Sequence, residues 1–99
     1  MKQPSLVLLV KFRSRLSLDE IMKVVDDRID QFRLLNGLEQ KFYLQEPATG
    51  EIAGLYLWDS EEDFTAYQDS ELRKFIAQAY QTEGEPRIEV FDVLKLLRE

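Results

Sequence analysis

The sequence of 99 residues contains no cysteine and no histidine. Without cysteine there is no disulfide, thiolate nucleophile, iron–sulfur cluster or thiolate zinc site. Without histidine there is no imidazole base, no Ser-His-Asp triad and no histidine ligand for haem or for non-haem iron. Any chemistry must therefore rest on carboxylates, lysine, tyrosine, hydroxyl groups or the substrate itself.

The sequence also lacks long apolar runs and an excess of positive charge. No segment approaches the ~20 apolar residues that a membrane helix needs. The apolar run 6–10 is shorter than a signal-peptide core, so we expect a cytoplasmic protein with no membrane partner. The formal net charge of −6 argues against nucleic acid as a partner, because phosphates are bound by basic side chains. With 44% hydrophobic and 32% charged residues, the chain is expected to form one domain over residues 1–99.

Hydrophobic periodicity predicts the element order β-α-β-β-α-β. The predicted strands cover residues 6–13, 38–46, 51–59 and 87–94. Ser17 caps a helix that is expected to end near residues 36–37, where Gly37 suits a left-handed turn. Ser60 and Ser70 cap two further helical segments before the last strand. This order predicts a ferredoxin-like α+β fold, in which right-handed crossovers place the helices on one face of an antiparallel sheet.

The strand 51–59 has apolar side chains on both faces. Tyr56 and Trp58 point one way, and Ala53, Leu55 and Leu57 point the other. An antiparallel sheet usually exposes one polar face to water. We therefore expect the second face to be covered by another copy of the chain, through an interface of about 800 Å² per partner.

The hairpin formed by 38–46 and 51–59 sorts its residues into two sets. The aliphatic-rich set contains Phe42, Leu44, Ala53, Leu55 and Leu57, and the aromatic set contains Lys41, Tyr43, Gly54, Tyr56 and Trp58. The division depends on the register of the hairpin, because a slip of one residue exchanges the two faces of a strand. In this register the aromatic set faces the helices, and Gly54 leaves room there for a ligand.

Most of the chain resembles a known family. The segments that carry the resemblance are Gly37-Leu38, Lys41, Tyr43-Leu44, the Gly50 turn, Gly54-Leu55-Tyr56-Leu57-Trp58, Ser60-Glu61, Ala66-Tyr67 and Phe91-Asp92-Val93. They resemble the YdhR-type monooxygenases of the antibiotic-biosynthesis-monooxygenase-like dimeric α/β-barrel superfamily. The motifs are loose and mostly structural, so they guide the fold better than the reaction.

The resemblance implies a homodimer in which two sheets pack together as a barrel, with a ligand cleft between each sheet and its helices. Characterised relatives oxidise quinols or polyketide anthrones with molecular oxygen and use neither metal nor flavin. The substrate loses a proton and then reduces oxygen itself, so no cofactor is expected. The haem-degrading branch is not expected here, because the histidine ligand is absent.

The expected ligand is a small aromatic molecule, either phenolic or quinol-like. Its pocket residues are expected to be Tyr43, Tyr56, Trp58 and Tyr67, and the residues that influence its ionisation are expected to be Lys41 and Asp92. An ammonium group favours a phenolate, and a carboxylate can accept its proton. No metal site is expected at Glu61, Glu62 and Asp63, because three adjacent helical residues cannot converge on one ion.

Two other functions were weighed against this one. An RNA-recognition motif has the same element order, but Ala53 and Leu55 then occupy the positions of its stacking aromatic residues and offer no ring to a base. A non-catalytic dimeric module that binds a small molecule or a protein fits the same sequence, because fold does not dictate function. A closed, packed space between Trp58 and the helices would favour that second function.

Overall fold

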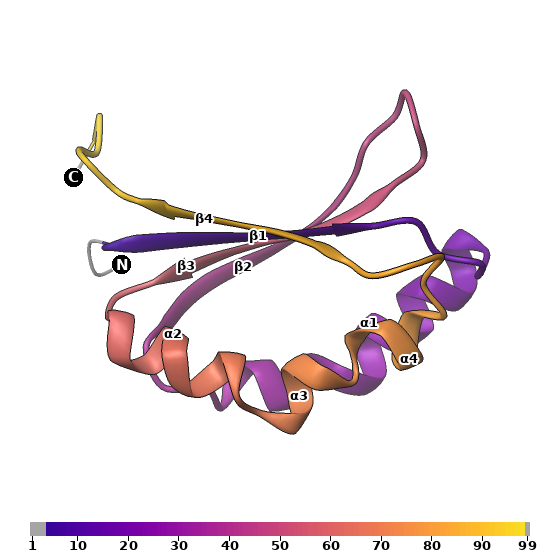
Figure 1. Ribbon diagram of the computed structural model, residues 1–99, viewed down its shortest axis with the longest axis horizontal. Coiled ribbons are helices and arrows are strands. Elements are labelled where there is room, and N and C mark those ends of the chain that lie inside the picture. The colour runs from indigo at the N-terminus through magenta and orange to yellow at the C-terminus, as the bar shows by residue number, and fades with distance from the viewer. Residues whose placement is uncertain (1–3, 99) are drawn as a thin grey trace.

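The computed structural model describes residues 4–98 and contains one four-stranded antiparallel sheet with helices along one side (Figure 1). The elements are β1 (Leu6–Phe12), α1 (Leu18–Arg33), β2 (Leu38–Gln45), β3 (Ile52–Trp58), α2 (Glu61–Gln68), α3 (Glu71–Lys74), α4 (Ile76–Tyr80) and β4 (Arg87–Asp92). The strand order is β2-β3-β1-β4. The predicted ferredoxin-like α+β fold is confirmed. Within residues 4–98, no helix has the length and apolar content to cross a membrane.

The helix α1 begins at the predicted capping box. The Ser17 hydroxyl accepts a hydrogen bond from the Glu20 backbone N–H at 3.2 Å, and the Glu20 carboxylate accepts one from the Ser17 N–H at 3.0 Å. The helix ends at Arg33, three residues earlier than predicted, because Leu34 already makes the tighter bonds of a C-terminal turn. Gly37 has the left-handed φ of 78°, but it serves the turn into β2 rather than the end of the helix.

The second helical region consists of three short helices. The hydroxyls of Ser60 and Ser70 accept N–H bonds at the starts of α2 and α3, as the sequence predicted. Phe75, with φ of −85° and ψ of 2°, separates α3 from α4. These breaks let the chain follow the twist of the sheet, and α4 brings Ile76 and Tyr80 against it as buried residues.

The register of β3 with its two neighbours confirms the predicted faces of the hairpin. Tyr56 lies opposite Lys41 of β2 and Leu8 of β1, and Gly54 lies opposite Tyr43 and Val10. The residues of this face are packed against α1, α2 and α4. The core contains Leu6, Leu8, Val10, Phe12, Ile21, Val25, Phe32, Ile52, Tyr56, Trp58, Tyr67, Ile76 and Tyr80.

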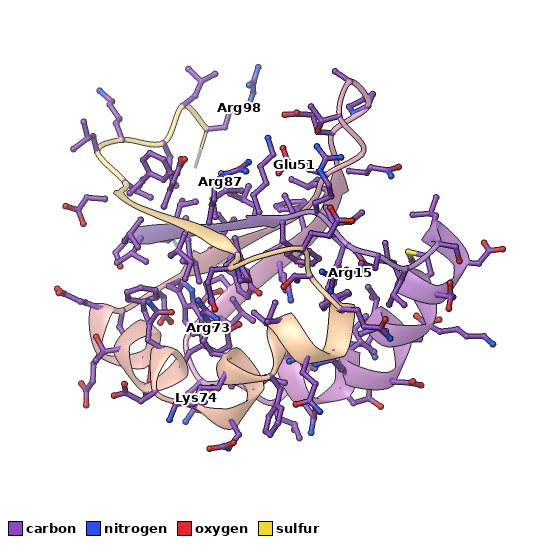
Figure 2. The ribbon with its side chains drawn as sticks, turned by 45° about the vertical axis from the view of Figure 1, so that its right-hand side comes forward. Arg15, Glu51, Arg73, Lys74, Arg87 and Arg98 are labelled. Atoms are coloured by element: carbon purple, nitrogen blue, oxygen red, sulfur yellow. The ribbon has the colours of Figure 1, made fainter. Side chains whose placement is uncertain are left out.

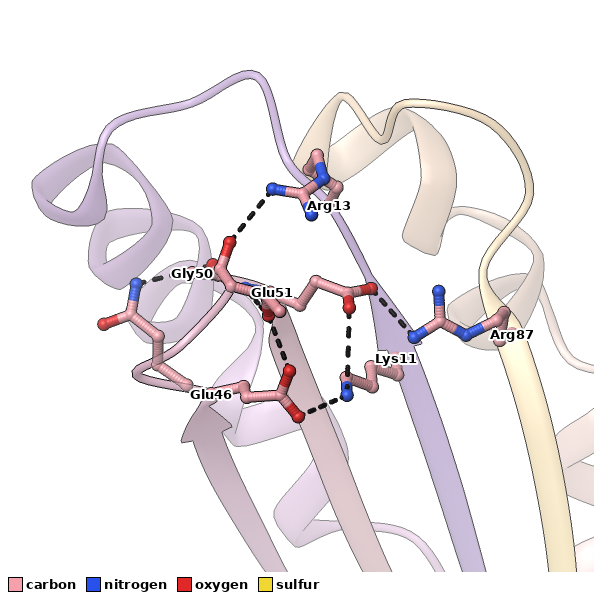
Figure 3. A network of polar contacts seen from close by, with 8 residues as sticks. Lys11, Arg13, Glu46, Gly50, Glu51 and Arg87 are labelled. Carbon is pink, nitrogen blue, oxygen red and sulfur yellow. Dashed lines mark hydrogen bonds and ion pairs between the residues drawn. The ribbon is translucent and has the colours of Figure 1, made fainter.

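The opposite face of the sheet is apolar at its centre and charged at one end. Phe42 and Leu44 of this open face are 45% and 44% exposed. Toward the β2–β3 turn, Glu51 pairs with Arg87 at 2.9 Å, and Lys11 pairs with Glu46 at 2.6 Å (Figures 2 and 3). These pairs join β1 and β4 to the β2–β3 turn at this end of the face.

We expect Gly37→Ala to destabilise the fold more than Gly84→Ala. Both glycines have φ near 78°, where a side chain costs roughly 1–2 kcal/mol. A Cβ on Gly37 would also lie 2.6 Å from Asp63 Cβ and 2.8 Å from Asp59 Oδ1, whereas a Cβ on Gly84 would meet nothing within 4 Å. Urea unfolding should show a loss at Gly37 that is larger by roughly 1–3 kcal/mol, the usual cost of overpacking. Equal losses would contradict this packing.

Candidate functional site

The amino group of Lys41 lies among three aromatic rings. Its Nζ atom is 3.4 Å from the ring centroid of Phe32 and 4.4 Å from those of Tyr43 and Tyr56. The missing side chain of Gly54 makes this position accessible, because a Cβ there would lie 3.3 Å from Lys41 Cε and 2.9 Å from Tyr56 Cε1. The space that the sequence assigned to a ligand above Gly54 is therefore filled largely by Lys41 and Tyr56.

Burial changes the ionisation of Lys41. Loss of solvent, reinforced by the positive charge of Arg28, lowers the pKa of Lys41 from 10.5 to about 6. The ring faces attract the ammonium form and oppose part of this fall. Among residues 4–98 the Nζ atom has no hydrogen-bond acceptor and no ion-pair partner. At neutral pH this side chain is thus a largely uncharged amine, which can accept a proton.

A small cavity lies beside Lys41, and we call it the Gly54 cavity. Its volume is about 20 Å³, enough for about one water-sized molecule. It is lined by Val10, Phe12, Arg28, Lys41, Ile52, Ala53, Gly54, Tyr56, Ile76 and Tyr80. This lining contains two basic side chains and no carboxylate.

Arg28 is the second basic group of the Gly54 cavity. Its guanidinium carbon lies 5.5 Å from the ring centroid of Phe32 and 5.8 Å from that of Tyr80. The Nη2 atom donates a hydrogen bond to the Leu72 carbonyl, which ties α1 to α3. The Nη1 atom is buried without a hydrogen-bond partner. The guanidinium also interacts with the Tyr80 hydroxyl, so the unused donor capacity of Arg28 is limited to Nη1.

A larger depression, here called the outer groove, lies between the end of α1 and β2. Its volume is about 330 Å³. It is lined by Ile29, Phe32, Arg33, Leu38, Glu39, Gln40, Lys41 and Tyr43. Lys41 lines both the outer groove and the Gly54 cavity, so one residue borders a space large enough for a ring and a space for about one water-sized molecule.

The remaining aromatic residues are packed in the core. Trp58 is fully buried, and its ring centroid lies 5.4 Å from that of Tyr67, which in turn lies 5.5 Å from that of Tyr56. The Tyr67 hydroxyl donates a hydrogen bond to the Tyr56 hydroxyl at 3.2 Å. The space between Trp58 and the helices is closed, so these three residues support the site from behind.

The tyrosines of the site remain protonated at neutral pH. Burial raises the pKa of Tyr43 to about 12 and raises the pKa values of Tyr56, Tyr67 and Tyr80 above their ordinary value. Tyr43 is only half-buried and lines the outer groove. Its hydroxyl is thus the phenol best placed to donate a hydrogen bond to a bound molecule.

The structure brings together five of the six residues that the sequence singled out. Lys41 contacts Tyr43 and Tyr56, and Tyr56 continues the contact to Tyr67 and so to Trp58. The sixth, Asp92, is exposed on the edge strand β4, opposite Leu6, and does not join them. Within residues 4–98, no group of three or more acidic side chains is arranged to hold a metal ion.

Arg28 was missed by the sequence reasoning, although a signal for it exists. It follows Val25 by three residues and precedes Phe32 by four, so it lies on the buried stripe of α1. A single basic residue in an apolar stripe must find aromatic or polar partners within the fold. That spacing could have placed Arg28 beside the sheet.

Solved structures with the same fold are found, although no protein-family model and no curated protein matches the sequence. SnoaB, a cofactor-independent oxygenase from Streptomyces nogalater, is 14% identical with a TM-score of 0.76, over 98% of this chain and 100% of its own. A candidate antibiotic biosynthesis monooxygenase from Caulobacter crescentus is 17% identical with a TM-score of 0.76, over 94% and 92%. A conserved protein from Methanosarcina mazei is 16% identical with a TM-score of 0.74, over 90% and 92%.

At these identities the likeness concerns the fold. It confirms that the chain shares the fold of SnoaB and of the Caulobacter crescentus protein, as the sequence resemblance implied. Membership of the antibiotic-biosynthesis-monooxygenase-like superfamily stays a prediction, as does the YdhR-type subgroup.

We expect the stability difference between Lys41→Met and the wild type to depend on pH. Because the folded pKa of Lys41 is about 6 and the unfolded value is 10.5, the unfolded state binds more protons between these values. The wild type should therefore gain stability relative to Lys41→Met as pH rises from 6 to 9, by up to about 1.4 kcal/mol per pH unit. Urea unfolding at each pH measures this, and Lys23→Met on the exposed side of α1 should show a constant difference from wild type. A constant difference at Lys41 too would contradict its burial.

Proposed function

We propose that the protein is a cofactor-independent monooxygenase that acts on a small phenolic or quinol-like molecule. The observation that carries the proposal is that Lys41 lines the outer groove with an amine for which residues 4–98 offer no hydrogen-bond acceptor. A ring bound in the groove would present its hydroxyl to this amine. The likeness in fold to SnoaB, a cofactor-independent oxygenase, adds support.

Lys41 would act as the base. The neutral amine takes the phenolic proton, and the resulting ammonium stabilises the phenolate that remains. A general base works best when its pKa lies near the working pH, and the pKa of about 6 for Lys41 satisfies that condition. The Tyr43 hydroxyl would donate a hydrogen bond to the same substrate oxygen from the side of the groove.

Deprotonation makes the substrate electron-rich enough to reduce molecular oxygen. In the overall reaction a quinol and O₂ give a hydroxyquinone and water. One oxygen atom enters the ring, the other leaves as water, and the substrate supplies all four electrons. The protein binds, desolvates and deprotonates the substrate, which requires neither histidine nor cysteine.

The roles of the other aromatic residues follow from their packing. Tyr56 would hold the Lys41 amine in place through its ring face. Trp58 and Tyr67 would hold Tyr56 rather than touch the substrate, because both are closed off from the outer groove. We assign proton transfer to Lys41 alone, since Asp92 lies on the exposed edge strand.

The protein would act as a homodimer joined through the open face of the sheet. Three aromatic or aliphatic side chains there, Phe42, Leu44 and Phe91, are 44–49% exposed in the single chain. A second copy would remove them from water, and the hydrophobic gain is roughly 25 cal/mol per Å² of apolar surface. The ion pairs at the hairpin end would border this interface.

A second candidate is a non-catalytic dimeric module that binds a small molecule. The closed space between Trp58 and the helices favours it, because a substrate cannot enter the aromatic cluster itself. The two candidates share the outer groove and the dimer. They differ only in whether oxygen is consumed there.

We expect Lys41→Met to abolish oxygen uptake while Lys23→Met leaves it unchanged. Uptake is measured with an oxygen electrode over a set of single-ring and fused-ring phenols and quinols. Loss of the base should lower kcat/KM by about 100-fold or more. In the wild type, log kcat/KM should rise with pH and level off above about pH 6, where Lys41 is neutral. Binding of phenols without any oxygen uptake would instead establish the binding module.

We expect Phe42→Asp to produce a monomer and Phe75→Asp to remain a dimer. The two phenylalanines are similarly exposed, 45% and 48%, but Phe42 lies on the open face and Phe75 lies between α3 and α4. Native mass spectrometry of the wild type should give twice the chain mass. A monomeric wild type, or equal behaviour of the two variants, would overturn the proposed interface.

A further inference from the structure

We propose that Lys41 and Arg28 together form a binding site for an anionic oxygen group carried by a single aromatic ring. The anionic group would lie between the two basic side chains at the Gly54 cavity, and the ring would lie in the outer groove. The ligand class is therefore the aromatic carboxylates and phenolates. The anion-site proposal rests on the proposed function in one respect: it assumes that an aromatic ring occupies the outer groove.

The donors on both sides of this site lack acceptors. Arg28 Nη1 is buried without a hydrogen-bond partner, and no described residue accepts a bond from Lys41 Nζ. Buried donors are nearly always paired in folded proteins, so Arg28 Nη1 points to a missing partner. Lys41 is partly buried, and its Nζ atom is open to a ligand in the outer groove. An oxygen atom of a ligand would provide an acceptor for each.

The charges around the site favour an anion. The lining of the Gly54 cavity has two basic groups and no carboxylate, and Arg28 disfavours the charged form of Lys41. The Arg28 guanidinium has no carboxylate in this lining, and an anion bound beside it and a protonated Lys41 would supply the missing negative charge. Tyr43 and Tyr56 face Lys41, and Tyr80 faces Arg28. Burial raises the pKa of each of these tyrosines, so none of them supplies the missing charge.

The available space fits a ring with one small charged group. An apolar cavity of about 150 Å³ is enough for benzene in another protein, and the outer groove has about 330 Å³. Its walls combine the Phe32 ring with Ile29 and Leu38. Glu39 is the one carboxylate of the groove lining, and no ion pair joins it to Lys41. Arg33, also in this lining, already pairs with Asp30 at 3.0 Å and is exposed, so the charge of the site rests on Lys41 and Arg28.

Binding of an anion here must be coupled to a proton. The amine has to be protonated before it can hold an anion, and the anion then raises the pKa of Lys41. Below pH 6 the free protein already carries that proton. Above pH 6 each bound anion must draw one proton from solution, so affinity falls by up to tenfold per pH unit until the pKa of the complex is reached.

Benzoate is the probe, and its neutral isostere benzamide is the control. The carboxyl group of benzoate has a pKa of about 4 and stays charged above pH 5.5. Titration calorimetry at pH 6, 7 and 8 should show benzoate affinity falling by up to about 100-fold, while benzamide affinity stays constant. Repeating the pH 7.5 titration in two buffers of different ionisation enthalpy should show uptake of close to one proton per benzoate.

The variants Arg28→Met and Lys23→Met separate the site from the general charge of α1. Each removes one positive charge from the same helix, but only Arg28 lines the Gly54 cavity. At pH 6 we expect Arg28→Met to weaken benzoate at least tenfold, the usual worth of a charge-assisted hydrogen bond, and Lys23→Met to change nothing. Arg28→Lys, which retains a positive charge, should recover part of the loss.

Benzoate binding that is independent of pH, equal to that of benzamide, or unaccompanied by proton uptake would overturn the proposal. These wild-type measurements decide the matter even if Arg28→Met fails to fold after losing its bond to Leu72. Oxygen uptake by a protein that does not bind benzoate would contradict the anion site and still support the proposed monooxygenase. Benzoate binding by a protein that consumes no oxygen with any phenol or quinol would support the anion site and contradict the proposed monooxygenase.

Discussion

The pairing of β3 with β1 and β2 determines both faces of this protein. Because side chains alternate along a strand, one register places Gly54, Tyr56 and Trp58 against the helices and the intervening residues on the open face. The same pairing places Lys41 opposite Tyr56 and above Gly54. A slip of one residue in β2 would move the amine to the open face and place Phe42 and Leu44 under the helices. The site and the proposed dimer surface are therefore two consequences of one constraint.

The burial of Lys41 lowers the stability of the folded protein and at the same time gives the amine its chemical role. A lysine that loses its hydration shell without gaining an ion pair destabilises the folded state while it is charged. Three ring faces offset part of this cost, and deprotonation removes the rest. A side chain held this way at some cost to stability is a reasonable mark of function, because buried, perturbed groups cluster at functional sites.

The sequence predicted most of the fold because its signals were local. The caps at Ser17, Ser60 and Ser70 are read from single residues, and the hairpin faces from a strict alternation. The end of α1 was predicted late, because residues 36–37 suit the left-handed end of a helix, whereas the helix ends at Arg33 and Gly37 serves the turn into β2. A glycine with positive φ marks a turn, but the sequence does not show whether the helix runs up to that turn or ends a few residues before it.

The site was less predictable, because it depends on contacts between distant elements. Lysine on an outer strand ordinarily reaches water, and only the packing of Phe32 of α1 across the sheet shows that Lys41 does not. The aromatic residues were found from their spacing, but which of them face a groove and which fill the core depends on how α2 and α4 lie over the sheet. Arg28 required the same knowledge, since its partners come from α3 and α4.

Lys41 has two proposed uses that need opposite protonation states: a neutral amine to deprotonate a phenol and an ammonium to bind a carboxylate. Which state is used depends on the ligand. A phenol brings the proton that the amine needs, so deprotonation inside the complex creates the ion pair without exchange with solvent. A carboxylate arrives without a proton, and the amine must be charged from solution first. Rising pH therefore favours turnover of phenols and disfavours binding of carboxylates through the same nitrogen atom. Aromatic carboxylates would then inhibit the enzyme, and more strongly at lower pH. Protonated Lys41 binds the carboxylate, but it cannot accept a proton from the phenol.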